Sequence, residues 1–256
     1  MVSWAFLLLA VLGAWLTLNA HRPHRGFGPI TVPSFFAGWL HSELVLHALA
    51  LQATIVAAAI WLGALERGVG WVGLFITAAS WGGMASLLLH ARQTGRTLGS
   101  ALRAGLGDDY KRGLPPRARA RLGVRLPWTQ LAAPLWFRRG GFEWIRDVPF
   151  VEGGHPRQRL DIYRRRGSLE RAPVLIQVHG GGWVIGNKRQ QGVPLMLHMA
   201  AQGWICVSTN YRLSPSATFP DHIIDIKRAI AWVREHIAEY GGDPEFIVIT
   251  GGSAGG

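Results

Sequence analysis

The sequence contains little cysteine and little negative charge. Its single cysteine, Cys206, excludes any disulfide within the chain. Cys206 lies in the apolar run 204–208, which predicts a buried strand with an inert core thiol. None of the three asparagines begins a glycosylation sequon, and no long repeat is present. The 256 residues include 15 acidic residues against 27 lysines and arginines, so the formal net charge is +12.

The positive charge is concentrated in one part of the chain. Residues 1–91 carry three basic and two acidic residues, residues 92–142 carry eleven and two, and residues 143–256 carry thirteen and eleven. The excess is therefore +1, +9 and +2. A basic segment beside a membrane span favours anionic lipid headgroups as its partner. Nucleic acid is the competing partner, but no recognition motif or interleaving of aromatic and basic residues supports it, so we expect none.

Three long runs in the first third lack charged residues: 2–18, 44–65 and 69–89. Each approaches the roughly 20 residues that cross a bilayer as a helix. We therefore predict a membrane domain of about three transmembrane helices over residues 1–91, with tryptophans near the span ends as interfacial anchors: Trp4, Trp39, Trp61, Trp71 and Trp81. A cleaved signal peptide is the alternative for the first run, although that run lacks a basic start.

The arginines predict the orientation of these spans. Arg22 and Arg25 lie in the first connection, and the segment after the third span is rich in arginine. This pattern predicts an N-terminus outside and the C-terminal part on the cytoplasmic side of a multi-pass membrane protein. His41, Glu43 and His47 have helical spacing, but no further ligand accompanies them, so we interpret them as packing or interfacial residues and expect no metal.

The most informative motif is Gly251-Gly252-Ser253-Ala254-Gly255, which directly follows the apolar run 246–250. This is a G-x-S-x-G sequence in the position of a nucleophile elbow, the sharp turn from a strand into a helix that exposes a reactive serine. Glycines flank the serine because side chains would clash in the strained turn. An ordinary strand-to-helix turn rich in small residues is the alternative.

A second motif lies upstream. The apolar run 173–178 predicts a buried strand and leads into His179-Gly180-Gly181-Gly182-Trp183, an H-G-G-G-type oxyanion loop. Glycines suit this task because backbone N–H groups can approach an oxyanion only where no side chain intervenes. A phosphate loop is the competing interpretation, but Asn187 stands where that motif needs lysine.

With both motifs in this order, the sequence resembles the hormone-sensitive-lipase-like (family IV) group of α/β-hydrolases. Further segments carry the resemblance, which covers roughly residues 143–256: 155–163, 210–215, 219–220, Trp232 and 241–244. One residue departs from the family pattern, because Gly252 replaces the aspartate that usually precedes the serine. We therefore predict an α/β fold, with transmembrane helices, then a basic amphipathic linker or cap over 92–142, then the first half of an α/β-hydrolase domain over 143–256, with a mostly parallel sheet.

The resemblance assigns roles by position. Ser253 is the nucleophile, the backbone N–H groups of Gly181, Gly182 and Ala254 form the oxyanion hole, and His179 and Gly180 support that loop. The acid and the histidine of the triad follow the serine in this fold. Asp221, Asp225 and Asp243 precede it, and we interpret Asp221 and Asp225 as solvated or capping residues of a helix. The 256 residues alone are therefore expected to be nearly inert.

The resemblance implies a serine esterase or lipase acting on a small-molecule or lipid ester, without a cofactor. Two alternatives stay open: a non-catalytic membrane protein with a degenerate hydrolase fold, and an acyltransferase or amidase of the same fold. Trp128, Trp136 and Phe137 either contribute to an acyl pocket or anchor the chain at a membrane interface.

Overall fold

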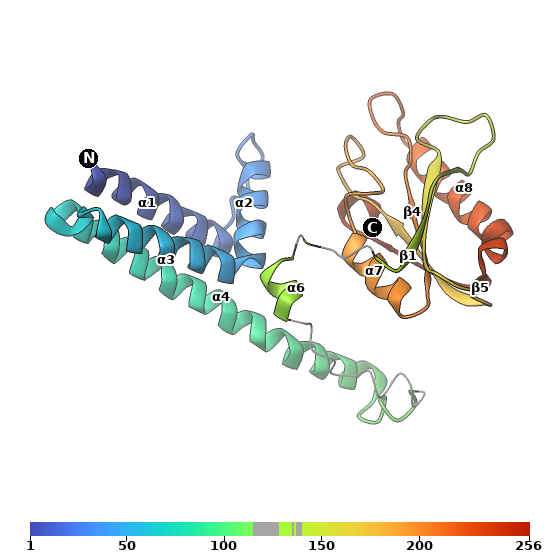
Figure 1. Cartoon of the computed structure of the whole chain (residues 1–256), viewed down its shortest axis with the longest axis horizontal. Helices are drawn as coiled ribbons and strands as arrows, with labels where there is room; N and C mark the ends of the chain where they lie inside the picture. Colours follow the sequence, from blue (N-terminus) through green and yellow to red (C-terminus); the bar gives the residue numbers. More distant parts are fainter. Residues whose placement is uncertain (115–127, 135, 137–139) are drawn as a thin grey trace. The chain divides into compact units, whose positions relative to one another are not determined.

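The computed structural model describes residues 1–114, 128–134, 136 and 140–256 (Figure 1). The chain forms two compact units, Met1–Ala132 and Ala133–Gly256, which are described separately. The predicted segment 92–142 contributes to both units, and its residues 115–127, 135 and 137–139 lie outside the described part, including Phe137. Trp128 and Trp136 are exposed.

The first unit is helical. Its elements are α1 (Val2–His21), α2 (Thr31–Glu43), α3 (Val45–Trp61), the short 3-10 helix η1 (Ala64–Glu66), α4 (Gly68–Leu106) and the short helix α6 (Trp128–Ala132). Helices α1 and α4 are long and apolar enough to cross a membrane, and α2 with α3 makes a third candidate span if this bent pair is counted as one. The predicted runs 2–18, 44–65 and 69–89 thus correspond to α1, α3 and α4.

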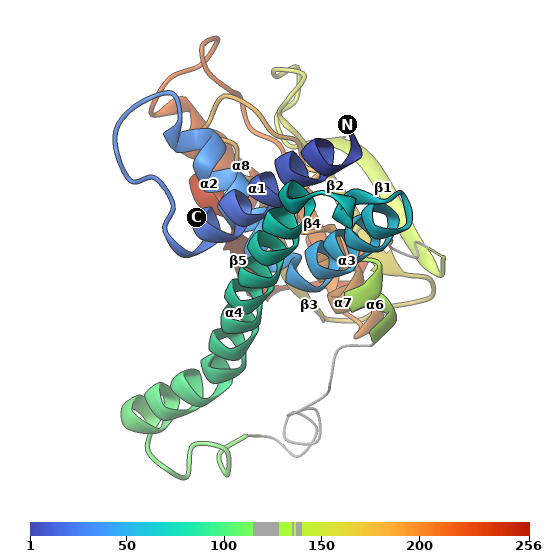
Figure 2. The same cartoon turned by 90° about the vertical axis from the view of Figure 1, so that its left-hand side faces the viewer.

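Helices α1, α3 and α4 lie side by side (Figures 1 and 2). Glycines in α4 allow close packing on α1, because a Cβ on Gly73 would lie 3.1 Å from the Phe6 ring and one on Gly83 would lie 2.7 Å from the Thr17 side chain. Thr17 Oγ1 also lies 2.8 Å from Ser80 Oγ and 2.9 Å from His41 Nε2. Phe6 near the start of α1 contacts Gly73, and Thr17 near its end contacts Gly83, so α1 and α4 run parallel.

Two features of this unit were not predicted. Residues 31–43 lie between the first two predicted spans and were expected to form part of their connection. They form helix α2 instead, which meets α3 at a bend of 88°. Helix α4 continues through Gly95 and Gly99 to Leu106, well beyond the apolar run that ends at residue 89. Its 39 residues extend over about 58 Å, roughly twice the thickness of a bilayer's hydrocarbon core. The second half of α4 carries several of the arginines of the basic segment.

Two glycines of α4 test how closely the start of this helix packs on η1. A Cβ on Gly70 would lie 1.8 Å from the carbonyl oxygen of Ala64, whereas one on Gly82 meets nothing within 4 Å. We expect Gly70→Ala to destabilise the unit by about 1–3 kcal/mol through overpacking. Gly82→Ala should be neutral or stabilise by up to about 1 kcal/mol through helix propensity. Thermal unfolding in detergent measures both, and equal effects of the two variants would contradict the packing.

The second unit is a sheet between helices. Its strands are β1 (Phe142–Pro149), β2 (Arg159–Arg165), β3 (Ala172–Val178), β4 (Ile205–Thr209) and β5 (Gly242–Gly251), in the order β1-β2-β4-β3-β5. Helix α7 (Val193–Ala201) connects β3 to β4, and α8 (Asp221–His236), with the 3-10 helix η2 (Ile237–Tyr240), connects β4 to β5. The strands predicted at 173–178, 204–208 and 246–250 are confirmed as β3, β4 and β5.

The prediction of a mostly parallel sheet needs correction. The β3–β4 and β3–β5 pairs are parallel, but β1–β2 and β2–β4 are antiparallel. Parallel neighbours require a crossover connection, and among the described strands only β3, β4 and β5 are joined in sequence through helices. The sheet is therefore mixed, with its parallel part at the β5 edge.

The two faces of the sheet are covered by different helices, as Figure 1 shows. Alternate residues of the central strands belong to two separate clusters, as the two-residue period of a strand requires. Val174 and Ile176 pack with Val233 of α8, whereas Leu175 and Cys206 pack with Met196 of α7. The Cys206 thiol is buried and lies 3.3 Å from the carbonyl oxygen of Met196, and burial raises its pKa to about 12. The predicted inert core thiol is confirmed.

Candidate active site

Ser253 occupies a sharp turn at the end of β5. The strand ends at Gly251, Gly252 is extended, and a short 3-10 helix, η3 (Ser253–Gly255), starts with the serine itself. Ser253 has φ of +54°, a left-handed conformation that is rare for a residue with a side chain. Such strain at an exposed serine between a strand and a helix is the geometry of a nucleophile elbow.

The glycines of this turn are required by close backbone contacts. A Cβ on Gly251 would lie 2.0 Å from the carbonyl oxygen of Gly255, and one on Gly255 would lie 2.4 Å from that of Val178. The steric reason predicted for the two flanking glycines is thus present in the structure. Gly252 differs, because a Cβ there would meet nothing within 4 Å. An aspartate at this position, as in the family pattern, would therefore fit without a clash.

The loop after β3 lies directly against this turn. A Cβ on Gly180 would lie 2.4 Å from the carbonyl oxygen of Gly252 and 3.1 Å from Ser253 Cβ. Because β3 and β5 are parallel neighbours, their carboxyl ends meet at one edge of the sheet and bring the two glycine motifs together. The two motifs begin at His179 and Gly251, 72 positions apart in the sequence, and the sheet register makes them adjacent.

The candidate oxyanion donors differ in their hydrogen bonding. The Gly180 N–H donates to Gln191 Oε1 at 2.8 Å and is therefore occupied. Gly181 and Gly182 have φ of +128° and +59°, and a turn closes as the N–H groups of Val184 and Ile185 donate to the Gly181 carbonyl. In the part of the chain that the structure describes, the N–H groups of Gly181, Gly182 and Ala254 have no acceptor.

His179 supports the loop from below. Its ring is buried, stacks on Tyr211 at 4.5 Å and has Nδ1 placed 2.8 Å from the Gly180 carbonyl oxygen. The Tyr211 hydroxyl donates to the His179 carbonyl at 2.9 Å. Burial, together with the charge of Arg157, lowers the pKa of His179 and outweighs the opposing effect of the Gly180 carbonyl. A neutral imidazole that donates through Nδ1 is a structural part of the loop.

Arg157 fixes the same loop, a role that the sequence analysis did not assign. Its Nε donates to the Tyr211 carbonyl at 2.8 Å, and a terminal nitrogen donates to the Gly186 carbonyl at 2.9 Å. The terminal nitrogen also lies 3.4 Å from His179 Nε2. The only sequence signal was its place in the segment 155–163 that resembles the family.

A cluster of four charged side chains holds the far end of the loop. Lys188 is 2% exposed and contacts Asp147 at 2.5 Å and the fully buried Asp161 at 2.6 Å. Arg189 contacts the same two carboxylates at 2.6 and 2.7 Å. Asp147 reaches the cluster from a bulge in β1, where it has φ of +57°. Only the Lys188–Asp161 pair is buried, and removing one partner of a buried ion pair costs about 3–5 kcal/mol. Asp147 and Arg189 are 46% and 36% exposed, and their contacts complete the attachment of residues 188 and 189 to β1 and β2.

The cluster keeps both carboxylates ionised. Hydrogen bonds from Lys188 and Arg189 lower the pKa of Asp147 to about 2. Burial acts to raise the pKa of Asp161, but hydrogen bonds from Arg189 and Lys188 outweigh it, so this pKa is also lowered. Lys188, which follows Asn187 in the loop, is thus paired with two carboxylates.

The acidic residues before the serine are structural. Asp225 is fully buried rather than solvated, which corrects the prediction: Arg212 donates to it from its backbone and its guanidinium, and Gln158 donates at 2.7 Å. Asp221, the first residue of α8, accepts the backbone N–H of Thr218 ahead of the helix and pairs with Arg212. No side-chain hydrogen bond from a described residue caps the start of α8, so the predicted capping role is wrong for this residue. Asp243 pairs with Arg171 at 3.0 Å. Among the described residues, no histidine or carboxylate is hydrogen bonded to Ser253.

The three residues weighed as metal ligands do not come together in the first unit. His41 contacts Thr17, and His47 Nε2 lies 2.9 Å from the Ala132 carbonyl oxygen. Within the described ranges, no group of three or more histidine, cysteine or acidic side chains is arranged to hold a metal ion.

The charged cluster predicts a pH dependence of stability. Since the folded-state pKa of Asp147 is lowered, its contribution is present above its unfolded-state pKa of about 4 and is lost as the pH falls towards about 2. We expect the thermal unfolding midpoint of the second unit to fall through this range. Asp147→Asn, which tolerates positive φ, should flatten the fall. An unchanged pH profile in this variant would contradict the assignment.

The chain is similar in sequence to known esterases. The BD-FAE family matches residues 160–256. The probable carboxylic ester hydrolase LipM of Mycobacterium tuberculosis is 43% identical over 98% of this chain and 58% of its own length. Esterase LipQ of the same organism is 61% identical over 43% of this chain and 26% of its own length. This chain therefore spans little more than half of the first relative and about a quarter of the second.

Solved structures show a partial likeness. The phosphonate-inhibited esterase B of Lactobacillus rhamnosis aligns with a TM-score of 0.44 and 27% identity over 50% of this chain and 43% of its own. The family resemblance read from the motifs is confirmed by the sequence relatives. The chain is thus similar in sequence to carboxylic ester hydrolases, and its residues 160–256 match the BD-FAE family.

Proposed function

We propose that this chain carries the nucleophile and the oxyanion hole of a serine carboxylic-ester hydrolase. The observation that carries the proposal is the strained Ser253, φ +54°, against which Gly180 of the H-G-G-G loop is packed. A serine in an elbow beside free backbone donors is the arrangement that acyl transfer requires.

The residues act in a defined order in this proposal. Ser253 Oγ attacks the acyl carbon and forms a new C–O bond, while the carbonyl oxygen becomes an oxyanion that accepts from Gly181, Gly182 and Ala254. Collapse expels the alcohol and leaves an acyl-enzyme, which water then hydrolyses. A general base must take the serine proton, and in this fold the acid and histidine that supply it follow the elbow in sequence. His179 is not that base, because its ring is engaged in the loop.

Exposed apolar side chains directly after the oxyanion glycines favour an ester whose acyl chain is apolar. Trp183, Val184 and Ile185 follow the glycines directly and are 51%, 56% and 68% exposed. An exposed apolar surface next to a reactive serine suits the acyl part of a small-molecule or lipid ester.

The alternatives from the sequence are separated by experiment. A non-catalytic protein with this backbone would keep Gly251 and Gly255 for the same steric reason, so labelling of Ser253 distinguishes it from an enzyme. An acyltransferase or amidase would use the same serine and donors and would differ in the acceptor of the acyl group.

We further propose that the first unit anchors the protein in a membrane. Helices α1, α3 and α4 would cross the bilayer, with α2 in the plane of its surface. The arginines after the third span would then bind anionic headgroups on the cytoplasmic side, where the C-terminal unit would also lie.

Ester hydrolysis by the 256 residues, alone and fused to a segment that supplies the acid and the histidine, tests the proposed acyl transfer. We expect the 256 residues alone to hydrolyse a nitrophenyl ester no faster than their Ser253→Ala variant, because a serine without a base loses several orders of magnitude in rate. Fusion to the acid- and histidine-bearing segment of an active relative should restore turnover and labelling by a fluorophosphonate.

Matched variants of the fusion sharpen this test. Ser253→Ala should abolish labelling, Gly255→Ala should reduce it at least tenfold, and Gly252→Ala should retain it within about twofold, since only Gly252 has space for a side chain. A folded fusion that is labelled equally with and without Ser253 would exclude the proposed nucleophile.

Cysteine labelling tests the membrane arrangement. Cys206 is fully buried and its pKa is raised to about 12, so an impermeant maleimide should not label the native thiol. In intact cells we expect Arg67→Cys, in the second connection, to be labelled from outside and Arg25→Cys, in the first, to be protected until the cells are opened. The reverse pattern would invert the orientation, and equal labelling of both would argue against spanning.

A further inference from the structure

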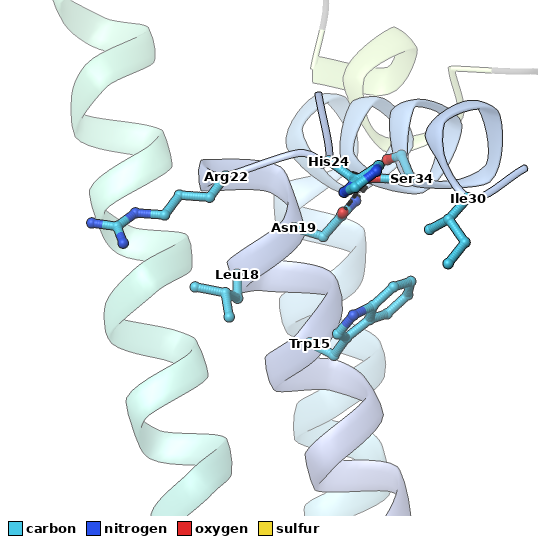
Figure 3. A pocket seen from close by; sticks show the side chains of 7 residues that line it. All are labelled: Trp15, Leu18, Asn19, Arg22, His24, Ile30 and Ser34. Atoms are coloured by element: carbon cyan, nitrogen blue, oxygen red, sulfur yellow. Dashed lines mark hydrogen bonds between the residues drawn. The ribbon is translucent and has the colours of Figure 1, made fainter. Parts of the chain in front are cut away.

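A cavity of about 280 Å³ lies at the corner between α1 and α2 in the first unit (Figure 3). It is separate from the serine site and has no part in the proposed acyl transfer. Its lining combines apolar, polar and cationic side chains: Trp15, Leu18, Asn19, Arg22, His24, Ile30 and Ser34.

Hydrogen bonds hold the corner in shape. Asn19 and Ser34 are buried and bonded to one another twice, from Asn19 Nδ2 to the Ser34 carbonyl at 2.7 Å and from Ser34 Oγ to Asn19 Oδ1 at 2.5 Å. Ser34 Oγ also accepts the backbone N–H of His24 at 2.8 Å (Figure 3). These polar groups are used by the fold, so they form the floor of the cavity rather than its ligand-binding groups.

The remaining lining side chains separate an apolar surface from a positive charge. Trp15, Leu18 and Arg22 have the spacing i, i+3 and i+7, which places them along one face of α1 with the arginine at the helix end. Trp15, Leu18 and Ile30 are 48%, 60% and 63% exposed. Among the described residues Arg22 has no ion-pair partner, and no carboxylate lines the cavity. Its guanidinium points away from the hydrogen-bonded floor, towards α4 (Figure 3).

We propose that this corner binds one anionic phospholipid. The phosphate meets Arg22 at the rim, and the first acyl carbons lie along Leu18 and Trp15, with Ile30 on the other wall. The inference rests on the proposed membrane insertion, in which the end of α1 lies at headgroup depth. A water-soluble phosphate would gain nothing from three exposed apolar side chains, and a zwitterionic headgroup would bring its own cation close to Arg22.

The exposed face of α2 supports a lipid as the occupant. Val32, Phe35, Phe36, Trp39 and Leu40 are each 48–62% exposed on a helix that turns 88° from α3. A short helix with exposed aromatic residues across the end of a span suits the interface of a bilayer, and it would border the bound lipid with apolar surface.

Native mass spectrometry of the purified chain in detergent tests the proposal, with phosphatidylglycerol and phosphatidylcholine as probes. Arg22→Gln should weaken retention of phosphatidylglycerol about fivefold, the effect of about one headgroup contact. Ile30→Asp, which places a carboxylate at the cavity wall, should weaken it at least as much. Arg67→Gln, which removes an exposed arginine from the second connection, is the matched control and should leave retention unchanged.

Three results would overturn the site. They are an equal loss in Arg67→Gln, equal retention of the two lipids by the wild-type chain, and displacement of phosphatidylglycerol by millimolar inorganic phosphate. Circular dichroism checks that each variant keeps its helices. Membrane insertion is tested separately by flotation of the wild-type chain with vesicles, so its failure is distinguishable from loss of the lipid site alone.

Discussion

The close approach of two glycine-rich backbone segments at the carboxyl edge of β3 and β5 is the constraint on which the site depends. A Cβ on Gly180 would lie 2.4 Å from the Gly252 carbonyl, and one on Gly255 would lie 2.4 Å from that of Val178. Backbone N–H groups can face an oxyanion beside Ser253 only if this contact is kept. The parallel pairing of β3 with β5 sets the register of the two segments and so makes the contact possible.

Charged groups that contact the loop maintain this arrangement. Arg157 binds two carbonyl groups around the His179 ring, and Lys188 lies between Asp147 and Asp161. Lys188 and Asp161 would each be costly to bury alone, and each satisfies the charge of the other. The flexible glycines can therefore adopt positive φ in a loop whose two ends are fixed to the sheet.

The features predicted correctly from the sequence are those that a short local pattern of residues determines. Apolar runs located β3, β4 and β5, and the serine and glycine motifs indicated the candidate site. Patterns of this kind carry no information on pairings between distant residues, so the burial of Asp225 with Arg212, the role of Arg157 and the antiparallel half of the sheet were missed. The bend between α2 and α3 was missed for a related reason, because its stabilising contacts, such as that of Asn19 with Ser34, join separate helices.

Ser253 and three backbone N–H groups are proposed to form one acyl-transfer site. The most direct test is an experimental structure of the extended chain after reaction with a phosphonate ester. We predict phosphorus bonded to Ser253 Oγ and the phosphoryl oxygen about 3 Å from the nitrogens of Gly181, Gly182 and Ala254. A phosphoryl oxygen that points to solvent, or an adduct on another residue, would contradict it.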